Sequence, residues 1–457
     1  MKLESVDKLK NDKQKGVSLL WLLPLCLLVA LGGLALKFYE TEQPQVALLE
    51  DVARFGLAKR VVVAVTDAKS GVRSVEVLLR QGTRQTMLHR QGYQSTGALI
   101  ASGPARVEEN FVVDMSSLGF ADGDAQLQVT ARDFSWWHWR QGNATVVSFP
   151  VIIDTQPPRV LVTAAPTYIK TGSSGIVTYR VSEPVVRNGV MVNGDFHPGY
   201  PLPARGEQVY GATIAIRYDA DKSMESYVTA TDQAGNESRV PVGMIVRKSS
   251  QKADRINISD GFLNRKLPEF ASHYPDLAGS PLEKYLTLNN RVRLENNKRI
   301  AEACSVSTPE RFWDGAFLRL PRSSRKAGYA DHRTYYFEGR EIDHQVHLGV
   351  DLASTRHAKV TAANRGKVVL ADYLGIYGNT VIIDHGQGVY SLYSHLSQID
   401  VMPGDMVDKG GAVGLSGTSG MAGGDHLHFS MLVNGIFVNP VEWWDRHWVK
   451  VNLGSYL

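Results

Sequence analysis

The chain contains only two cysteines, Cys26 and Cys304, in 457 residues. They cannot form a disulfide framework, because Cys26 lies within an apolar segment. The formal net charge is also small, at +4, so the charge balance gives no argument for a nucleic-acid partner. Stability must therefore come from hydrophobic cores, and a hydrophobic share of 43% is typical of globular protein rather than of disorder. The length is enough for about three domains.

An apolar segment without a charged residue runs from residue 17 to residue 36. About 20 residues of helix span the roughly 30 Å hydrocarbon core of a bilayer, so we expect a transmembrane helix at 17–36. The lysines that precede it predict a cytoplasmic tail at 1–16 and the rest of the chain beyond the membrane. A cleaved signal peptide is the alternative, with Ala30-Leu31-Gly32 as its cleavage site, although the apolar region is longer than such peptides usually have.

Two strand-rich modules of similar sequence follow, at 44–155 and 158–248. Val129-Thr130-Ala131-Arg132-Asp133 is matched by Val228-Thr229-Ala230-Thr231-Asp232, and a Gly-Asn pair follows each. A repeat of about 100 residues fits a seven-strand β-sandwich. The pair resembles bacterial immunoglobulin-like modules. The first module also contains Trp136-Trp137-His138-Trp139, which we expect to pack on its own module or its neighbour; an exposed loop that grips glycan or peptide is the alternative.

The pattern changes to helical between residues 250 and 320. Ser280-Pro281-Leu282-Glu283 has the form of a capping box with proline at the first helical position. Apolar residues then recur at near-helical spacing, and Thr308-Pro309-Glu310 suggests a second short helix. We expect a helical connector that packs on the following domain or covers its groove.

After residue 320 the pattern is strand and turn, and histidines gather at informative spacings. Side chains alternate along a strand, so His426 and His428 point to the same face. Two imidazoles on one face are costly in a core, because each needs polar partners when buried. His347 and Asp351 add a nitrogen and a carboxylate oxygen. Zinc favours N and O donors, and a catalytic zinc keeps one position open for water.

In this order, with His395 between them, the motifs resemble the H-x-G-x-D and H-x-H signatures of lysostaphin/LytM-type zinc peptidases, over roughly residues 340–445. The resemblance implies an antiparallel β-sheet peptidase domain at 321–448 at the C-terminus of a mainly β chain. It implies that His347, Asp351 and His428 hold Zn²⁺. It also implies that His395 and His426 are catalytic, beside the water that the metal activates. Their separate roles stay open.

Two positions depart from the pattern of many relatives, which have proline before the H-x-H pair and an acidic residue after the phenylalanine that follows it. Here these positions are Asp425 and Ser430. Neither is a ligand in the pattern, so we expect a difference only among the partners of the ligands. His344 competes with His347 on spacing alone, but the Gly and Asp of the motif favour His347. His385 is expected to be a turn residue.

The resemblance implies a zinc endopeptidase that hydrolyses peptide cross-links of peptidoglycan. With the predicted helix it would be a single-pass protein of the inner (cytoplasmic) membrane, its N-terminus in the cytoplasm and its bulk in the periplasm. A D-amino-acid cross-link is expected rather than a glycyl bridge. The alternative is a non-catalytic regulator that binds cell wall or activates another wall hydrolase. A further hypothesis is that the connector holds the enzyme latent.

Overall fold

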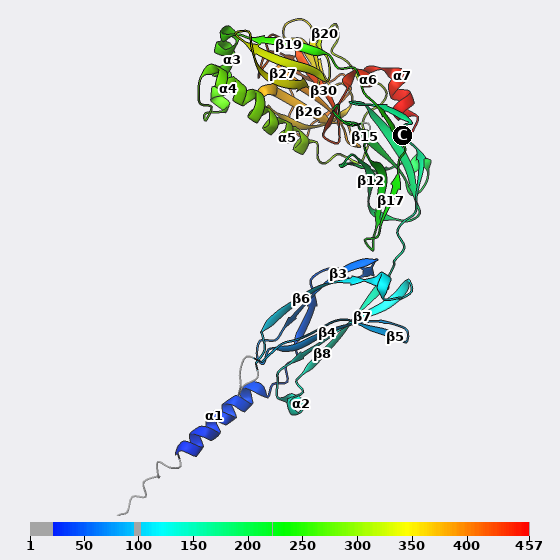
Figure 1. Cartoon of the computed structure of the whole chain (residues 1–457), viewed down its shortest axis with the longest axis vertical. Coiled ribbons are helices and arrows are strands. Elements are labelled where there is room, and N and C mark those ends of the chain that lie inside the picture. The colour runs from blue at the N-terminus through cyan, green and yellow to red at the C-terminus, as the bar shows by residue number, and fades with distance from the viewer. Residues whose placement is uncertain (1–21, 96–101, 222, 457) are drawn as a thin grey trace, which may run out of the picture. The chain divides into compact units, whose positions relative to one another are not determined.

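The computed structural model describes residues 22–95, 102–221 and 223–456, and the chain is mainly β, as predicted (Figure 1). It divides into two compact units. The first runs to Gln156 and includes residues 234–236, and the second holds the remaining described residues. Both cysteines are free, as expected.

Helix α1 (Leu22–Phe38) occupies most of the segment predicted to cross a membrane. Residues 17–21 of that segment and the tail predicted at 1–16 lie outside the described residues. Within the part of the chain that the structure describes, no helix has both the length and the apolar character needed to span a membrane. The transmembrane helix stays a prediction.

The first unit builds two sheets around one hydrophobic core, in the orders β1-β3-β6 and β2-β8-β7-β4-β5. Every second residue of β7 faces the core, and Leu127, Val129 and Ala131 are fully buried. The tryptophan loop is packed only in part, because Trp137 contacts Tyr39 edge-on while Trp139 is 97% exposed. The elements are β1 (Gln45–Leu48), β2 (Arg54–Phe55), β3 (Ala58–Thr66), β4 (Val72–Gln81), β5 (Arg84–Gly92), β6 (Arg106–Asp114), η2 (Met115–Ser117), β7 (Gly123–Asp133), α2 (Trp137–Arg140) and β8 (Ala144–Ile153).

The second unit begins with another pair of four-stranded sheets, in the orders β14-β15-β11-β9 and β13-β12-β16-β17, around a core of its own. β16 ends at Asp232 as β7 ends at Asp133, which places the sequence repeat on corresponding strand ends. The likeness to immunoglobulin-like modules stays a prediction. The elements are β9 (Val160–Ala164), β10 (Tyr168–Lys170), β11 (Ser174–Val181), β12 (Val185–Val192), β13 (Asp195–Pro198), β14 (Tyr200–Pro201), η3 (Pro203–Arg205), β15 (Val209–Ala215), β16 (Ser226–Asp232), β17 (Glu237–Pro241) and β18 (Ile245–Arg247).

The predicted capping box is present where α4 begins: the Ser280 hydroxyl accepts from the backbone of Glu283, whose carboxylate accepts from Ser280 N at 2.7 Å. The region is not wholly helical, because β19 pairs in parallel with β21. The second short helix predicted at Thr308 is wrong. The N–H of Thr308 donates to Asp384, so this backbone bonds to the neighbouring sheet instead of to itself. The elements are β19 (Ala253–Ile258), α3 (Asp260–His273), α4 (Pro281–Thr287), the π-helical turn η4 (Leu288–Val292) and α5 (Arg293–Ala303).

A ten-stranded sheet with only antiparallel pairings forms the C-terminal part. Its path is β20-β23-β30-β27-β26-β25-β28, so β30 lies between β23 and β27. Figure 1 shows α3, α4 and α5 together beside this sheet. The elements are β20 (Ser324–Ala327), β21 (Asp331–Phe337), β22 (Arg340–His347), β23 (Val350–Ala353), β24 (Lys359–Thr361), β25 (Gly366–Tyr373), η5 (Gly375–Tyr377), β26 (Asn379–Asp384), β27 (Val389–Ile399), β28 (Met406–Val407), β29 (Ala412–Ser416), β30 (Leu427–Val433), β31 (Ile436–Val438), α6 (Pro440–Trp444), α7 (Arg446–Val449) and η6 (Lys450–Gly454).

Trp443 closes the core of this sheet. It is fully buried, with ring centroids 5.8 Å from Trp313 and 5.2 Å from Phe317. We expect Trp443→Ala to lower the free energy of unfolding by about 3–5 kcal/mol, because the cavity cannot refill. Urea denaturation followed by fluorescence measures this. Met402→Ala, at an exposed site of the same unit, should change stability by about 0.5 kcal/mol at most; equal effects of the two changes would contradict the packing argument.

Candidate metal centre

Three strands bring the predicted ligands together. His347 ends β22, Asp351 lies in β23 and His428 lies in β30. β23 and β30 are antiparallel, and their register sets Asp351 directly opposite His428. Opposite residues of paired strands have Cβ atoms about 5 Å apart, so the carboxylate and the imidazole meet.

Hydrogen bonds to the outer nitrogen of each ring fix which nitrogen faces inward. His347 Nδ1 lies 2.7 Å from the carbonyl oxygen of Gly328. A carbonyl only accepts, so Nδ1 carries the hydrogen and Nε2 keeps a lone pair. His428 Nε2 lies 3.1 Å from Ser430 Oγ, whose own hydrogen goes to Leu348 O at 2.8 Å. His428 therefore donates from Nε2, and its Nδ1 keeps a lone pair.

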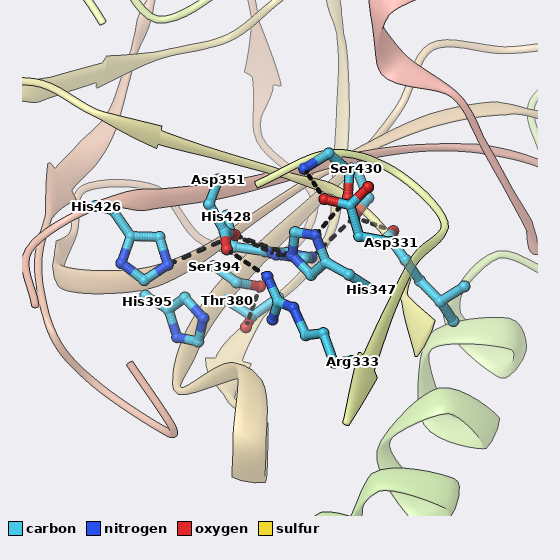
Figure 2. Close-up of polar contacts among 12 residues, drawn as sticks. Asp331, Arg333, His347, Asp351, Thr380, Ser394, His395, His426, His428 and Ser430 are labelled. Atoms are coloured by element: carbon cyan, nitrogen blue, oxygen red, sulfur yellow. Dashed lines mark hydrogen bonds and ion pairs between the residues drawn. The ribbon is translucent and has the colours of Figure 1, made fainter. Parts of the chain in front are cut away.

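The inward-facing atoms converge on one point (Figure 2). His347 Nε2, His428 Nδ1 and Asp351 Oδ1 lie 3.0 Å from one another. Lone pairs at this distance repel unless a cation lies among them. Tetrahedral zinc with bonds of about 2.0–2.2 Å sets its ligand atoms about 3.4 Å apart, so this N, N, O donor set fits a zinc ion with little movement.

Arg333 decides which oxygen of Asp351 faces the imidazoles. Its Nη2 donates to Asp351 Oδ2 at 3.0 Å, which leaves Oδ1 for the centre. Burial opposes ionisation of Asp351, yet the surrounding imidazoles, His347 foremost, hold the pKa of Asp351 well below its usual range. The carboxylate is therefore charged.

The two histidines predicted to be catalytic lie beside the donor atoms. His395 Nδ1 donates to Ser419 O and His426 Nδ1 donates to Gly424 O, each at 2.8 Å. Both carbonyls belong to the glycine-rich loop between β29 and β30. Each ring thus keeps Nε2 for the cavity. The ring centroids lie 4.8 Å apart, and His426 Nε2 is 3.5 Å from Asp351 Oδ1.

Burial sets the charge of the innermost rings. It lowers the pKa of His428 to about 4 and that of His395 well below its usual value. Both are neutral near pH 7, and metal coordination requires neutral imidazole. Burial also acts against the charged form of His426, but the hydrogen bond and charge of Asp351 raise its pKa overall.

The three donor residues and the two further histidines line one cavity of 480 Å³. Tyr377 also lines this cavity, with its ring centroid 5.6 Å from that of His428. Asn379 does not line it, and its side chain donates to Leu396 O. His344 is exposed and pairs with Glu341, away from the donor atoms.

The departures from the motif have structural roles. Ser430 holds the outer nitrogen of His428, where many relatives have an acidic residue. Asp425, at the usual proline position, accepts from Ser416 Oγ at 2.6 Å. His385 is buried between Arg365 O and Ser391 Oγ, which agrees with a structural role.

Two partners of the ligands could not be predicted from the sequence. Arg333 and Gly328 lie outside the histidine motifs, and no spacing marks them. Gly349 shows why its motif contains glycine. A Cβ there would lie 2.6 Å from two atoms of the His428 ring and 2.5 Å from Ser430 Oγ.

Ser430→Ala removes the acceptor for the N–H of His428. We expect the affinity for zinc to fall about 10- to 100-fold, the usual effect of losing a partner of a metal ligand. Competition with a chromophoric chelator measures this on the full-length chain. Ser305→Ala, at an exposed site, should leave the affinity unchanged. An unchanged affinity in Ser430→Ala would contradict the assignment of the His428 tautomer.

Comparisons with known proteins place this region in a family. Residues 345–440 match the sequence model of Peptidase family M23. The chain is 38% identical over 98 residues to the DD-carboxypeptidase/endopeptidase Mpg of Neisseria meningitidis, covering 21% of this chain and 23% of that protein. It is 36% identical over 98 residues to the murein hydrolase activator EnvC of Escherichia coli, with the same shares of 21% and 23%. The catalytic domain of lysostaphin from Staphylococcus simulans is 28% identical over 29% of this chain and 98% of that one, with a TM-score of 0.25.

The chain spans less than a quarter of the length of these two curated relatives. The stretch that matches the family nevertheless contains all three donor residues and both histidines that face the cavity. The resemblance inferred from the motifs is confirmed: residues 345–440 form a peptidase family M23 domain.

Proposed function

We propose that the chain is a zinc-dependent endopeptidase that hydrolyses peptide cross-links of peptidoglycan. One observation carries the proposal: three metal-donor atoms and the Nε2 atoms of two further imidazoles meet in a single cavity. A metal site that served structure alone would be closed by a fourth protein ligand. Here the donor set has three members and adjoins open space, as a hydrolytic site requires.

A zinc ion in this site supplies a Lewis acid for a peptide carbonyl and lowers the pKa of water. His347, Asp351 and His428 would hold it, with Arg333 and Ser430 orienting the donors. His395 and His426 each present Nε2 to the cavity. A neutral ring takes a proton at Nε2, and a protonated ring donates one to the oxyanion or to the leaving amine. Two such rings supply both proton transfers that amide hydrolysis needs.

The proposed bond is a cross-link between D-amino acids. The name of the Neisseria relative describes a DD-carboxypeptidase/endopeptidase, and 98 residues of this chain align with it at 38% identity. This supports a D-amino-acid bond over a glycyl bridge.

The second candidate is a regulator that activates another wall hydrolase. The likeness to EnvC, which is named an activator, favours it. The complete donor set and the cavity beside it favour the enzyme, because a regulator has no use for two imidazole nitrogens facing an open metal site.

Isolated sacculi test the proposal directly. We expect the purified full-length chain to convert cross-linked muropeptide dimers into monomers, as separated by chromatography and identified by mass. His428→Ala should lose zinc and this activity. His395→Ala should keep zinc and lose about 100-fold or more in rate, because it removes a proton-transfer group.

His344→Ala is the matched control, because His344 lies in the same region but away from the donor atoms; it should keep both zinc and activity. Undiminished hydrolysis in His395→Ala would contradict the role of that histidine. Bound zinc without hydrolysis in the unaltered chain would favour the activator, or latency imposed by the connector. Hydrolysis that survives loss of zinc would overturn the metal-dependent mechanism.

We also propose that the chain acts from the periplasmic side of the inner membrane, held by residues 17–36. The support is the uncharged apolar segment and the lysines that precede it. Membrane fractionation of cells that express the full-length chain should recover it with the inner membrane, resistant to carbonate extraction. Protease added to spheroplasts should degrade the C-terminal part. Recovery in the soluble periplasmic fraction would instead indicate cleavage of a signal peptide.

A further inference from the structure

The connector forms part of the wall of the cavity that contains the metal centre. Residues of β19, α3, α4 and α5 line it together with the donor residues. Three arginines are among them: Arg265 on α3, Arg293 at the start of α5, and Arg333 on β21. Asp351 is the only acidic residue in the lining. The wall therefore carries an excess of positive charge before any metal is bound.

Arg333 is the one arginine with an acidic partner in the cavity, because it binds Asp351. Arg265 and Arg293 form no ion pair with a carboxylate among the residues that the structure describes. Arg293 Nε donates to Asn289 O at 3.0 Å, and its Nη2 donates to Asn289 Oδ1. A guanidinium has five N–H donors, so most of those of Arg293 are left for another group.

Arg293 is held in place by neutral groups. Asn289 is fully buried, and its amide nitrogen donates to Asp343 at 2.7 Å, which turns its oxygen toward the guanidinium. This orients Arg293 without neutralising it. The preceding turn, Leu288–Val292, is π-helical. Such turns are rare and frequently occur at functional sites.

Helix α5, which begins at Arg293, contacts a side chain of the metal centre's wall. Arg293 and Asn297 lie four residues apart on α5 and so share a face of the helix. Asn297 Oδ1 accepts from the Tyr377 hydroxyl at 2.9 Å, and the Tyr377 ring contacts that of His428. Arg293 and Tyr377 both line the cavity. Arg293 therefore shares the cavity wall with Tyr377 and with His428, the metal-donor residue that Tyr377 contacts.

We infer that Arg293, with Arg265, forms a subsite for a free carboxylate of the peptide substrate, close to the bond that is cut. The inference rests on the proposed function and refines its substrate class. A stem peptide that carries free side-chain or α-carboxylates supplies this anion. A glycyl bridge is neutral along its length and cannot. Amidation of the carboxylate removes the charge while keeping the shape. The subsite thus selects anionic stem peptides.

Steady-state kinetics with paired substrates test the inference. The substrates are a cross-linked dimer with free carboxylates and the same dimer with carboxamides in their place. The full-length chain should prefer the free acid about tenfold in kcat/KM, the effect of one charge-assisted hydrogen bond. Arg293→Gln should remove this preference by raising KM for the free acid, with little change in kcat.

Arg291→Gln is the matched control: it removes an exposed arginine that pairs with Glu295 one turn away and does not line the cavity. It should keep the preference. Arg265→Gln changes an exposed side chain, so it should fold normally and weaken the preference even if Arg293→Gln misfolds. A wild-type chain that does not distinguish the two dimers, or an unchanged KM in both arginine variants, would overturn the subsite.

Binding separates failure of the subsite from failure of the proposed function. If the chain hydrolyses neither dimer, calorimetric titration with the free-acid and amidated tetrapeptides still reports on the arginines. Tighter binding of the free acid that Arg293→Gln abolishes supports the subsite in a chain without peptidase activity. Equal binding of both peptides, or no binding of either, overturns it.

Discussion

The convergence of three lone pairs on one point is the constraint on which the rest of the site depends. Two imidazole nitrogens and a carboxylate oxygen at 3.0 Å destabilise one another unless a cation is present. The fold keeps these three atoms close together because each side chain also forms a hydrogen bond on the side that faces away from the centre. These partners, Gly328 O, Ser430 Oγ and Arg333, come from three separate segments. Since each is a directional hydrogen bond, they fix the tautomers and the carboxylate oxygen that faces the centre.

The strand order makes this arrangement rigid. β30 is hydrogen-bonded on both sides, so His428 faces Asp351 across one pairing and Ser394 across the other. Local backbone features then complete the site. Gly349 leaves room for the His428 ring. His395 has φ of +61°, a left-handed conformation that is costly for a residue with a side chain. The strained residue is therefore one whose ring faces the cavity, and backbone strain of this kind often occurs at functional sites.

The sequence predicted the histidines and aspartate of the site because motif spacing reflects strand geometry directly. It did not predict Arg333, because an arginine in a strand gives no sign of which face it occupies or what it meets. The capping box predicted α4, since its signal is local. Strand β19 was not predicted, because its partner β21 lies about 80 residues away. The helix expected at Thr308 failed for a related reason: the bonds of its backbone to Asp384 and His385 are tertiary. Structure that depends on neighbouring residues could be predicted from the sequence, whereas structure that depends on partners distant in sequence could not.

The metal-donor residues and the charged wall of the cavity come from different parts of the chain. The stretch that matches family M23, residues 345–440, contains every donor atom and both histidines that face the cavity. The cavity walls from β19, α3 and α5 lie before it, as do Arg293 and the ligand-orienting Arg333. Relatives that share the matched stretch can therefore share the metal-donor residues without sharing the charged wall of the cavity. If the connector supplies the carboxylate subsite, identity within the family domain indicates which reaction is accessible, while the segment before it determines which peptide reaches the metal.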